Sequence, residues 1–596
     1  TNNEDYPLLA NGESGSEAYL EGNLPYGNQE WNQEYSPSYA VFDVQGNEIS
    51  VNVYNLAGDS TDPDSELIDS FRVTKDTDGG EKATGEENGN STVDVEQIGR
   101  YDAGMTNADG GVMEIVDYNT ETGWAYAVNG QTGYLTAIPI KDMESKETVD
   151  LLDGNDIDIR SIVEENCEGF TYGDMTSVSV SEDGTLLAVA IQAEGYTENG
   201  RVAVFNCNED GTLTFNRAYE TGVQPDMVTF TPDGSSILTA NEGEPREGYG
   251  EDTVDPAGTI TVIELAYGTA DASVTEVDFT AYDSAEERQS LVDAGIVLQK
   301  GVNPSADFEP EYIAAGNDVA YVTLQEANAI AVLDLDAKEI TGVYSAGFED
   351  YSTVAVDIDK KDEAYNPKTY EDLKGIRMPD GIALYTADGV DYLVTANEGD
   401  AREWGDYLNE DERDFGDGET SPTGKITAEN SGLTGKVVFF GSEDYDGLED
   451  GVDYLYGGRS FTVFRADENG LTEVYDSGSE IEAKTAEYVP GNFNCSNDDV
   501  SMDDRSGKKG PEVESVTTGT VGDRTYVFVG LERVGGVMVY DITDPENTVF
   551  ANYINSRDYS ADIAGDDSPE GLSFIPAAES EDGNAYLLAA CEVSGT

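Results

Sequence analysis

The feature that most constrains the fold of this chain is an irregular internal repeat of short strand-like segments. One copy begins with Pro-Asp-Met-Val at residues 225–228, passes through an Asp-Gly turn, and ends with Leu-Thr-Ala-Asn-Glu-Gly at 238–243. A second copy begins with Pro-Asp-Gly-Ile at 379–382 and ends with Val-Thr-Ala-Asn-Glu-Gly at 394–399. Apolar stretches on both sides of an Asp-Gly turn are typical of a β-hairpin. Each copy therefore predicts two antiparallel strands whose first strand opens with an acidic residue.

Five looser copies follow the same plan, so the repeat occurs seven times. Their paired segments are 113–116 with 127–130, 175–178 with 189–192, 310–313 with 322–326, 511–513 with 529–532, and 569–572 with 589–592. Helical periodicity is almost absent, and repeated hairpins of this kind form the blades of propellers. A β-sandwich is the alternative, but it does not explain the recurring Pro-acid opening. The sequence predicts an all-β fold, a seven-bladed β-propeller with a small N-terminal β appendage.

The ends of the chain and two insertions set the expected domain organisation. Residues 1–95 are predicted to form the appendage and an acidic linker, and residues 96–596 the propeller. The last blade is incomplete at the C-terminus, because no third strand follows its second; we expect residues 97–101 to supply its outer strand. The largest insertions, at about 399–458 and 481–510, are long loops of the kind that carries function or shields a binding surface.

Composition excludes several classes of function. Histidine is absent, which rules out a Ser-His-Asp triad and a His-ligated zinc site within this sequence. Asp and Glu number 123 against 31 Lys and Arg, so the net charge of 31 − 123 = −92 disfavours nucleic acid as a partner. No apolar run is long enough to span a membrane. The acidity suits a secreted protein in a salty or calcium-rich medium, although it could also serve solubility alone.

The cysteines and the first residues of the chain constrain the function less than the composition does. Cys167, Cys207, Cys495 and Cys591 lie far apart without a Cys-x-x-Cys motif, which disfavours a zinc cluster. Disulfides and buried free thiols both stay open. The sequence starts with Thr1 and shows no signal peptide, so it is interpreted as a mature or trimmed chain.

Acidic residues occupy two equivalent positions in most copies of the repeat. The first strand of a propeller blade lines the central channel, and its start lies beside the end of the second strand. The first position holds Glu114, Thr176, Asp226, Glu311, Asp380, Glu512 and Glu570, and the second includes Glu242, Glu326, Glu398, Glu532 and Glu592. Both sets are therefore expected around one mouth of the channel.

So many carboxylates in one place cannot all ionise unless cations compensate or some keep their protons. Oxygen ligands in this number favour Ca²⁺, with another divalent metal such as Mg²⁺ or Mn²⁺ as the alternative. The sequence thus predicts calcium as the cofactor. A purely structural interpretation is that these acids cap strands and accept hydrogen bonds from the backbone of neighbouring blades.

Arginine residues lie close to the acidic motifs although only 31 residues are basic. The candidates for holding a phosphate or another anionic ligand are Arg246, Arg402, Arg459 and Arg505. Arg binds phosphate and carboxylate in a forked geometry, and a metal beside it can activate water at phosphorus. The alternative is that each Arg pairs with a nearby acid, as Arg246 could with Glu247. The loop around Trp404 is interpreted as a solvated acidic loop or as a lid with a second cation site.

Four motifs in combination point to a known family. They are Asn-Glu-Gly-x-x-Arg-Glu at 241–247 and 397–403, Val-Thr-Leu-Gln-Glu at 322–326, Gly-Arg-Ser-Phe at 458–461, and Lys-Gly-Pro-Glu at 509–512. Over about residues 97–596 the chain resembles the choice-of-anchor I family. The resemblance implies an exported bacterial β-propeller, extracellular or at the cell surface, with varied cell-wall anchors. The family is similar to mesenchyme-specific cell-surface glycoproteins of mineralising tissue. Some members are named alkaline phosphatase, and others are fused to metallophosphoesterase or nucleotidase domains, which implies a link to calcium or phosphate.

Three local features qualify the resemblance. Thr176 occupies a position that is acidic in the other copies, and the stretch 503–509 is less acidic than expected before its Pro-Glu. Near the N-terminus, residues 67–73 are similar to the tail of a metallophosphoesterase. That similarity implies a catalytic domain upstream of Thr1.

The sequence supports two functions from different classes. The first is a propeller that binds calcium at its acidic central mouth and contacts a surface partner or glycan. The alternative is a metal-dependent phosphomonoesterase in which carboxylate-bound metal supplies the nucleophile and Arg246 and Arg402 hold a phosphorylated small molecule. A lyase or glycosidase with paired carboxylates is a third interpretation, but no spacing distinguishes it. Substitution of Arg246 and Arg402 separates the first two, because only turnover depends on them.

Overall fold

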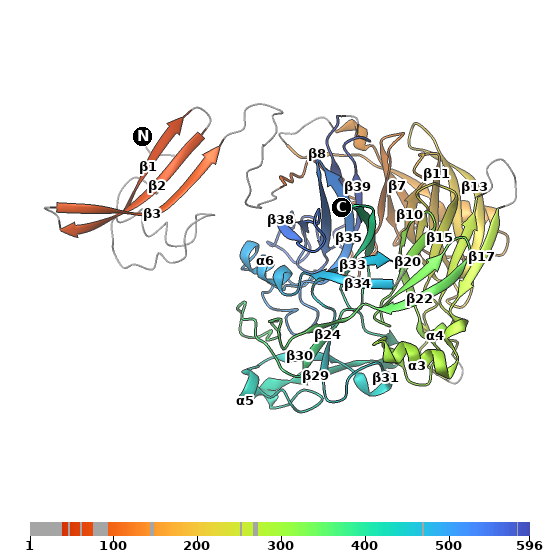
Figure 1. Cartoon of the computed structure of the whole chain (residues 1–596). Helices are drawn as coiled ribbons and strands as arrows, with labels where there is room; N and C mark the ends of the chain where they lie inside the picture. The colour runs from red at the N-terminus through yellow and green to blue at the C-terminus, as the bar shows by residue number, and fades with distance from the viewer. Residues whose placement is uncertain are drawn as a thin grey trace. The chain divides into compact units, whose positions relative to one another are not determined.

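The computed structural model describes the strands within residues 38–74 and, with their side chains, residues 93–143, 148–250, 253–265, 272–467, 470–580 and 582–596. The chain divides into two compact units, residues 1–89 and 90–596. In the first unit an antiparallel sheet has the order β1 (Ser38–Gln45), β2 (Glu48–Asp59), β3 (Asp62–Thr74) (Figure 1). The segment compared with a metallophosphoesterase tail lies in β3.

In the described part of the second unit, seven antiparallel sheets of neighbouring strands follow one another along the chain. Sheets one to three are β5 (Val116–Asn119), β6 (Trp124–Asn129), β7 (Tyr134–Ile138), β9 (Asn155–Asp158); β10 (Tyr172–Val180), β11 (Leu186–Ala193), β12 (Asn199–Cys207), β13 (Leu213–Val223); and β14 (Pro225–Phe230), β15 (Ser236–Asn241), β16 (Thr259–Glu264), β17 (Ser273–Asp278). Sheets four and five are β19 (Pro310–Ala315), β20 (Val319–Leu324), β21 (Ala329–Asp334), β22 (Glu339–Ser345); and β25 (Ile382–Ala387), β26 (Val390–Ala396), β33 (Phe461–Asp467), β34 (Gly470–Asp476). Sheets six and seven are β35 (Val513–Val521), β36 (Arg524–Leu531), β37 (Val537–Asp541), β38 (Val549–Ile554); and β39 (Pro569–Ile575), β40 (Tyr586–Cys591).

The first strands of these sheets are neighbours in a ring. β5, β10, β14, β19, β25, β35 and β39 contact one another in that order, and β39 also contacts β5. This is the arrangement of a β-propeller, in which the first strand of each sheet lines the central channel. The prediction of an all-β fold is confirmed. Each predicted repeat overlaps the first two strands of one sheet.

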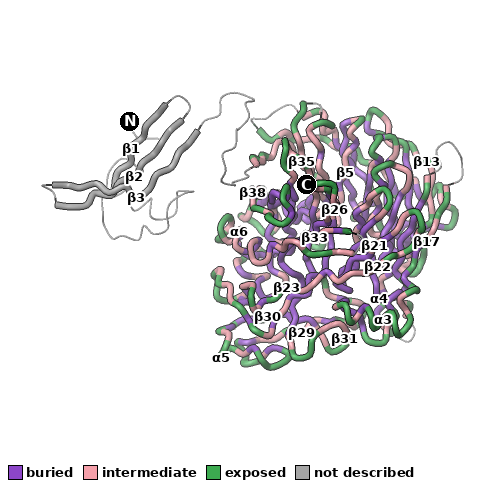
Figure 2. The backbone as a smooth tube through the Cα atoms, viewed as in Figure 1, coloured by how far each residue is buried: buried purple, intermediate pink, exposed green. Residues whose placement is uncertain are grey.

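The core lies between adjacent sheets, and the side-chain alternation of the second strands explains why (Figure 2). In β6, Tyr126 and Val128 pack into a cluster shared with sheet two, whereas Ala125 and Ala127 pack into another that includes Ala590 of sheet seven. A strand covered on both faces is apolar at every position, as β6 is from Trp124 to Val128. Full burial of one Val or Leu side chain contributes about 1.5–3 kcal/mol.

Tight hairpin turns connect the first and second strands where the Asp-Gly pairs predict them. Gly184 and Gly234 have φ angles of 64° and 67°, and Asp388 and Gly389 have 52° and 78°. Asp388 and Gly389 meet the requirement of a type I′ turn, which is two consecutive positive φ angles. In the other two turns only the glycine has a positive φ angle, and its N–H donates to the carbonyl three residues earlier, Ser181 or Thr231. These Asp-Gly pairs therefore form tight turns, as predicted.

The seventh sheet corrects one expectation. Residues 97–101 do not add a strand to β40, because β4 (Gly99–Arg100) pairs in parallel with β8 (Asp150–Leu151). The side chains of Gln97 and Arg100 instead bond to Asp566. In the described residues β40 has a strand neighbour on one side only, and a cavity of about 460 Å³ borders it.

The larger insertion, 399–458, and two segments outside the predicted insertions, 296–308 and 346–378, form a separate layer below the sheets in Figure 1. Its strands are β18 (Leu298–Gln299) with β31 (Tyr445–Asp446), β23 (Phe348–Asp350) with β24 (Leu373–Ile376) and β32 (Asp453–Tyr456), β27 (Glu403–Trp404) with β28 (Tyr407–Leu408), and β29 (Glu410–Asp414) with β30 (Lys436–Phe440). Helices are short: α2 (Ile159–Asn166), α3 (Ala285–Asp293), α4 (Pro304–Asp307), α5 (Ala428–Ser431) and α6 (Glu480–Tyr488). The layer has its own apolar core, which includes Phe415, Phe439 and Leu455. The large insertion is therefore a folded layer and not only a surface loop.

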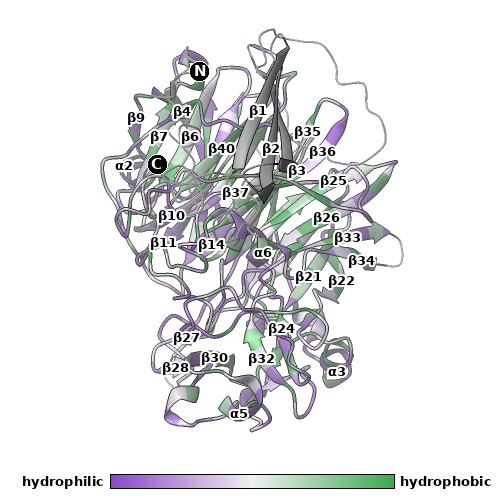
Figure 3. Cartoon of the chain, turned by 90° about the vertical axis from the view of Figure 1, so that its left-hand side faces the viewer, coloured by the Kyte–Doolittle hydropathy of each residue, from purple (hydrophilic) through white to green (hydrophobic). Residues whose placement is uncertain are grey.

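The described residues answer the question about the cysteines and agree with the sequence on membrane spans. The four cysteines are free thiols, two of them buried, so the thiol alternative holds. None of the described helices combines the length and apolar character that a bilayer span requires. Figure 3 shows that hydrophobic residues concentrate in strands such as β26 and β32.

Candidate metal centre

Each hairpin of the repeat brings its two acidic positions to the same end of its sheet. In sheet three Pro225 pairs with Asn241, so the next residues, Asp226 and Glu242, lie beside each other. The register shifts immediately after this pair, and similar shifts occur at the same place in sheets two, four, six and seven. Such bulges bend a strand and re-aim its side chains, and they are common next to functional sites. The predicted placement of both acidic sets at one mouth follows from this register.

The backbone before the first strand is also unusual in three repeats. Gln224, Met378 and Ser568 each precede the repeat's proline and have φ angles of 53°, 46° and 60°. A non-glycine residue in the left-handed region costs free energy and persists only where the surrounding structure holds it. The mouth is therefore built on a conformation that the fold enforces.

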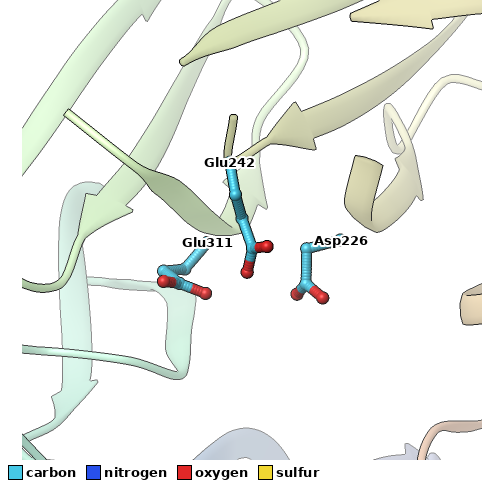
Figure 4. Close-up of side chains that lie close together, drawn as sticks. All are labelled: Asp226, Glu242 and Glu311. Carbon is cyan, nitrogen blue, oxygen red and sulfur yellow. The ribbon is translucent and has the colours of Figure 1, made fainter. Parts of the chain in front are cut away.

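Asp226, Glu242 and Glu311 form one group of carboxylates, called here the unpaired cluster. Each offers an oxygen atom within 4.8 Å of the others, and Figure 4 shows the three side chains pointing toward one another. No Lys or Arg of the described residues forms an ion pair with any of them. Burial raises the pKa of Asp226 to about 6, and burial with neighbouring carboxylates raises those of Glu242 and Glu311 well above their usual range.

A fourth carboxylate, Glu326, adjoins this cluster. Its charge acts on Glu311 and Asp380, so it lies near both. Glu326 is only 7% exposed, and its Oε2 atom has no hydrogen-bond partner in the described residues. A buried carboxylate oxygen without a partner is costly, and a cation removes that cost.

Arg246 is the basic residue whose charge acts on Asp226, a member of the unpaired cluster. Its Nε atom lies 3.1 Å from Glu244 and its Nη2 donates to Gln192 at 2.8 Å. Its charge opposes the rise in the pKa of Asp226, while the side chain stays 39% exposed. Arg246 thus lies at the mouth, as predicted, but it pairs with Glu244 and not with Glu247.

Glu398, Glu512 and Glu532 form a second group within 4.8 Å, called here the paired cluster. Lys509 contacts Glu398 and lies 3.2 Å from Glu512. Arg533 lies 2.9 Å from Glu512 and 3.0 Å from Glu532, and Arg505 also contacts Glu512. Burial alone would raise the pKa of Glu512, but these three basic residues hold it well below its usual range.

The other predicted ligands are divided among different partners. Asp380 lies within 4.8 Å of Glu398 and Glu514, and burial with these charges raises its pKa well above normal. Burial and neighbouring carboxylates also raise the pKa values of Glu114 and Glu570 well above normal. Glu592 accepts a hydrogen bond from the backbone N–H of Gly111 at 3.0 Å, as the structural interpretation expects. The hydroxyl of Thr176 donates to the carbonyl of Pro225 at 2.9 Å.

Two of the four predicted anion ligands are used inside the fold, which corrects that prediction. Arg402 is 1% exposed and lies 3.0 Å from Asp307 and 3.3 Å from Glu309. Arg459 is 2% exposed, lies 2.7 Å from Glu482, and donates to three backbone carbonyls. Neither guanidinium is free to hold a phosphate, since binding would leave buried carboxylates unpaired. Arg246 and Arg505 are the two that lie at the mouth.

Sequence reasoning missed two residues of the mouth, Glu514 and Lys509, as site residues. Glu514, and not Glu512, occupies the first acidic position of its repeat, which corrects that assignment. Val513 pairs with Leu531 and is followed by the same register shift as Pro225, which pairs with Asn241. Lys509 lies just before the Pro-Glu opening of its repeat. Its contact with Glu398, which is 111 positions away, had no sequence signal.

Comparison with known proteins fits this geometry. The model of the choice-of-anchor I domain matches residues 114–545. The chain belongs to this family. The match includes both the unpaired and the paired cluster, whereas Glu570 and Glu592 lie beyond its last residue.

Two curated relatives are animal proteins. A mesenchyme-specific cell surface glycoprotein of Strongylocentrotus purpuratus is 28% identical over 329 residues, which are 46% of this chain and 41% of that protein. Gigasin-3a of Magallana gigas is 31% identical over 166 residues, which are 25% of this chain and 57% of that protein. The chain thus matches about half of the length of these relatives.

Solved structures show only distant similarity. A Lactobacillus plantarum protein aligns with 78% of this chain and 89% of its own at 11% identity and a TM-score of 0.39. The Cps50 (Swd1) β-propeller domain of Myceliophteria thermophila aligns with 82% and 98% at 8% identity and a TM-score of 0.37. The propeller arrangement therefore rests on the ring of first strands described above.

Proposed function

We propose that this protein is an extracellular or cell-surface β-propeller of seven blades that binds calcium at its acidic mouth and has a binding or structural role. Membership of the choice-of-anchor I family and the similarity to a cell surface glycoprotein support the location. The seven sheets and the ring of their first strands support the blade number.

The unpaired cluster is the observation that carries the calcium proposal. Three carboxylates meet there without an ion-pairing Lys or Arg among the described residues, beside the partnerless Oε2 of Glu326. Holding like charges together lowers the stability of the folded protein, and a bound cation offsets that loss. Ca²⁺ takes about 6–8 oxygen ligands in flexible geometry, which suits carboxylates from different strands.

Calcium at this position would act mainly as a link between sheets. Asp226 and Glu242 belong to sheet three, whereas Glu311 belongs to sheet four. One ion held by all three would join two neighbouring blades at the channel. The expected consequence is a more stable propeller in calcium-rich surroundings.

The geometry favours binding over phosphomonoester hydrolysis. Arg402 and Arg459 are engaged in buried ion pairs, so binding a phosphate would leave their carboxylate partners unpaired. Phosphoryl transfer needs cationic groups that face the reacting phosphate. The two remaining arginines lie at different clusters. Arg246 lies beside the unpaired cluster, and Arg505 contacts Glu512 of the paired cluster.

Calorimetric titration of calcium into chelated protein tests the proposal, with thermal melts as a second readout. We expect saturable calcium binding and a rise in Tm. Asp226→Asn should weaken the calcium affinity at least tenfold and reduce the rise in Tm. Glu182→Gln, which removes an exposed acid in a turn, is the matched control and should bind like wild type. Neither heat nor a Tm shift in wild type would refute calcium binding. Calcium-dependent hydrolysis of a generic phosphomonoester, lost in Asp226→Asn, would instead support the enzyme.

A further inference from the structure

A small cavity of about 220 Å³ opens beside the paired cluster. Four of the chain's 31 basic residues line it: Arg505, Lys508, Lys509 and Arg533. In a chain with 123 acidic residues this local concentration of positive charge is unusual. The sequence contributes three of the four from one short stretch, 505–509, which is the segment that is less acidic than its surroundings.

Internal ion pairs use three of these four positive charges and leave that of Lys508. Arg505, Lys509 and Arg533 all contact the same buried carboxylate, Glu512. Lys509 also contacts Glu398 and lies 3.6 Å from Asp400, and Arg533 lies 3.0 Å from Glu532. Lys508 forms no ion pair with any described residue.

Donor atoms of the lining also lack acceptors. The Nε atom of Arg505 and the indole Nε1 of Trp404 are both buried, and neither has a hydrogen-bond partner in the described part of the chain. Both residues line the cavity. A ligand that offers oxygen atoms in the cavity would supply acceptors for both donors.

The remaining lining residues, called here the acidic wall, have a different character. They include the aromatic side chains of Trp404 and Tyr456 and the carboxylates of Asp400, Glu403 and Glu410. Aromatic rings pack against flat or weakly polar faces, and carboxylates accept hydrogen bonds from hydroxyl groups. The cavity is smaller than the about 300–1,000 Å³ of drug-sized sites, so it suits one ring.

We propose that this cavity binds a sugar acid, such as a uronate unit of an anionic saccharide. Arg505 and Lys508 hold the oxyanion, Trp404 packs against the ring, and the acidic wall accepts hydrogen bonds from the hydroxyls. A sulfated sugar presents the same chemistry through a different oxyanion. The site goes beyond the calcium proposal, because the unpaired cluster supplies none of these atoms.

Calorimetric titration of the full chain with galacturonate, in the presence of a chelator, tests the site. Saturable binding is expected, with galactose and inorganic sulfate each at least tenfold weaker. Galactose 6-sulfate, titrated in parallel, shows whether a carboxylate or a sulfate is preferred. A chelated sample makes the result independent of calcium, so failure of one proposal is distinct from failure of the other.

Variants place the binding. Lys508→Met and Trp404→Leu should each weaken galacturonate binding at least tenfold, and Lys508 has no internal ion pair whose loss would destabilise the fold. Lys361→Met removes an exposed positive charge elsewhere and should bind like wild type. Equal binding of galactose would overturn the oxyanion contact, and equal binding of sulfate would overturn the ring contact. A Kd above about 10 mM, or unchanged binding in both variants, would overturn the site.

Discussion

The unpaired and paired clusters draw on the same repeat, yet their charges are balanced in different ways. Glu398 and Glu532 follow second strands as Glu242 does, whereas Glu512 precedes Val513 as Gln224 precedes Pro225. Asp226, Glu242 and Glu311 face one another without ion pairs in the described residues, and burial raises their pKa values. The paired cluster has its positive charge built in, through Lys509, Arg505 and Arg533. A repeat position therefore does not determine chemistry, because the neighbouring loop decides whether a carboxylate needs an external cation.

The origin of the difference is an insertion. The loop before sheet six supplies Arg505 and Lys509, which reach Glu512 and Glu398. The repeat at sheet three has only Arg246 nearby, and it pairs with Glu244. Metal dependence is thus expected on one side of the mouth, and metal-independent stability on the other.

The largest effect is expected when the paired cluster loses its central acid. Glu512→Gln leaves Arg505, Lys509 and Arg533 buried with too little negative charge, which should lower the free energy of unfolding by about 3–5 kcal/mol. Urea denaturation in chelator measures it. Glu242→Gln is the counterpart in the unpaired cluster and should be neutral or stabilising there, because it removes repulsion. An equal loss in both variants would erase the distinction between the clusters.

A comparable but smaller loss is expected from Arg402→Met. The variant leaves Asp307 and Glu309 without their basic partner, and both are 2% exposed or less. The free energy of unfolding should therefore fall by about 3 kcal/mol. Calcium affinity should stay unchanged, because Arg402 belongs to neither cluster. Thermal melts with and without calcium check both statements. If the variant melts like wild type but loses ligand binding, Arg402 would instead be a ligand-binding residue of the mouth.

Substitutions in the unpaired and paired clusters should differ in their effect on calcium affinity by about tenfold, or about 1.4 kcal/mol. Glu311→Gln should weaken calcium binding at least tenfold, whereas Glu532→Gln, its matched change in the paired cluster, should leave it within twofold. Calorimetric titration at constant ionic strength measures both. The reverse order would place the ion in the paired cluster.

A last effect concerns pH and a carboxylate outside both clusters. Asp117 on β5 accepts hydrogen bonds from Val180 and Ser573 of the adjacent sheets, and burial raises its pKa to about 6. Since the folded state holds this proton more tightly than the unfolded state, its contribution to stability is complete below about pH 4 and is lost as pH rises through about 6. Relative to Asp117→Asn, wild type should lose about 2 kcal/mol between pH 4 and 7. A flat difference in urea melts across this range would contradict the shift.

Parts of the site could be predicted because they are local. The Pro-acid opening and the acid after the second strand are joined by one hairpin, so Asp226 and Glu242 had to meet once the register was set. Arg402 and Arg459 were predicted at the mouth because they stand close in sequence to the acidic motifs of the repeat. Their actual partners, Asp307 and Glu482, lie elsewhere in the sequence, and no local pattern indicates such a pair.

The sequence by itself determined the all-β class, the hairpin repeat, its Asp-Gly turns and the two acidic positions, because strand alternation and turn chemistry act over a few residues. Tertiary structure alone decided which carboxylates are neutralised. It placed Lys509 against Glu398 and buried Arg402 beside Glu309. It also paired β4 with β8 and not with β40. The physical reason is that charge pairing and strand addition depend on distances across the fold, which the order of residues along the chain does not contain.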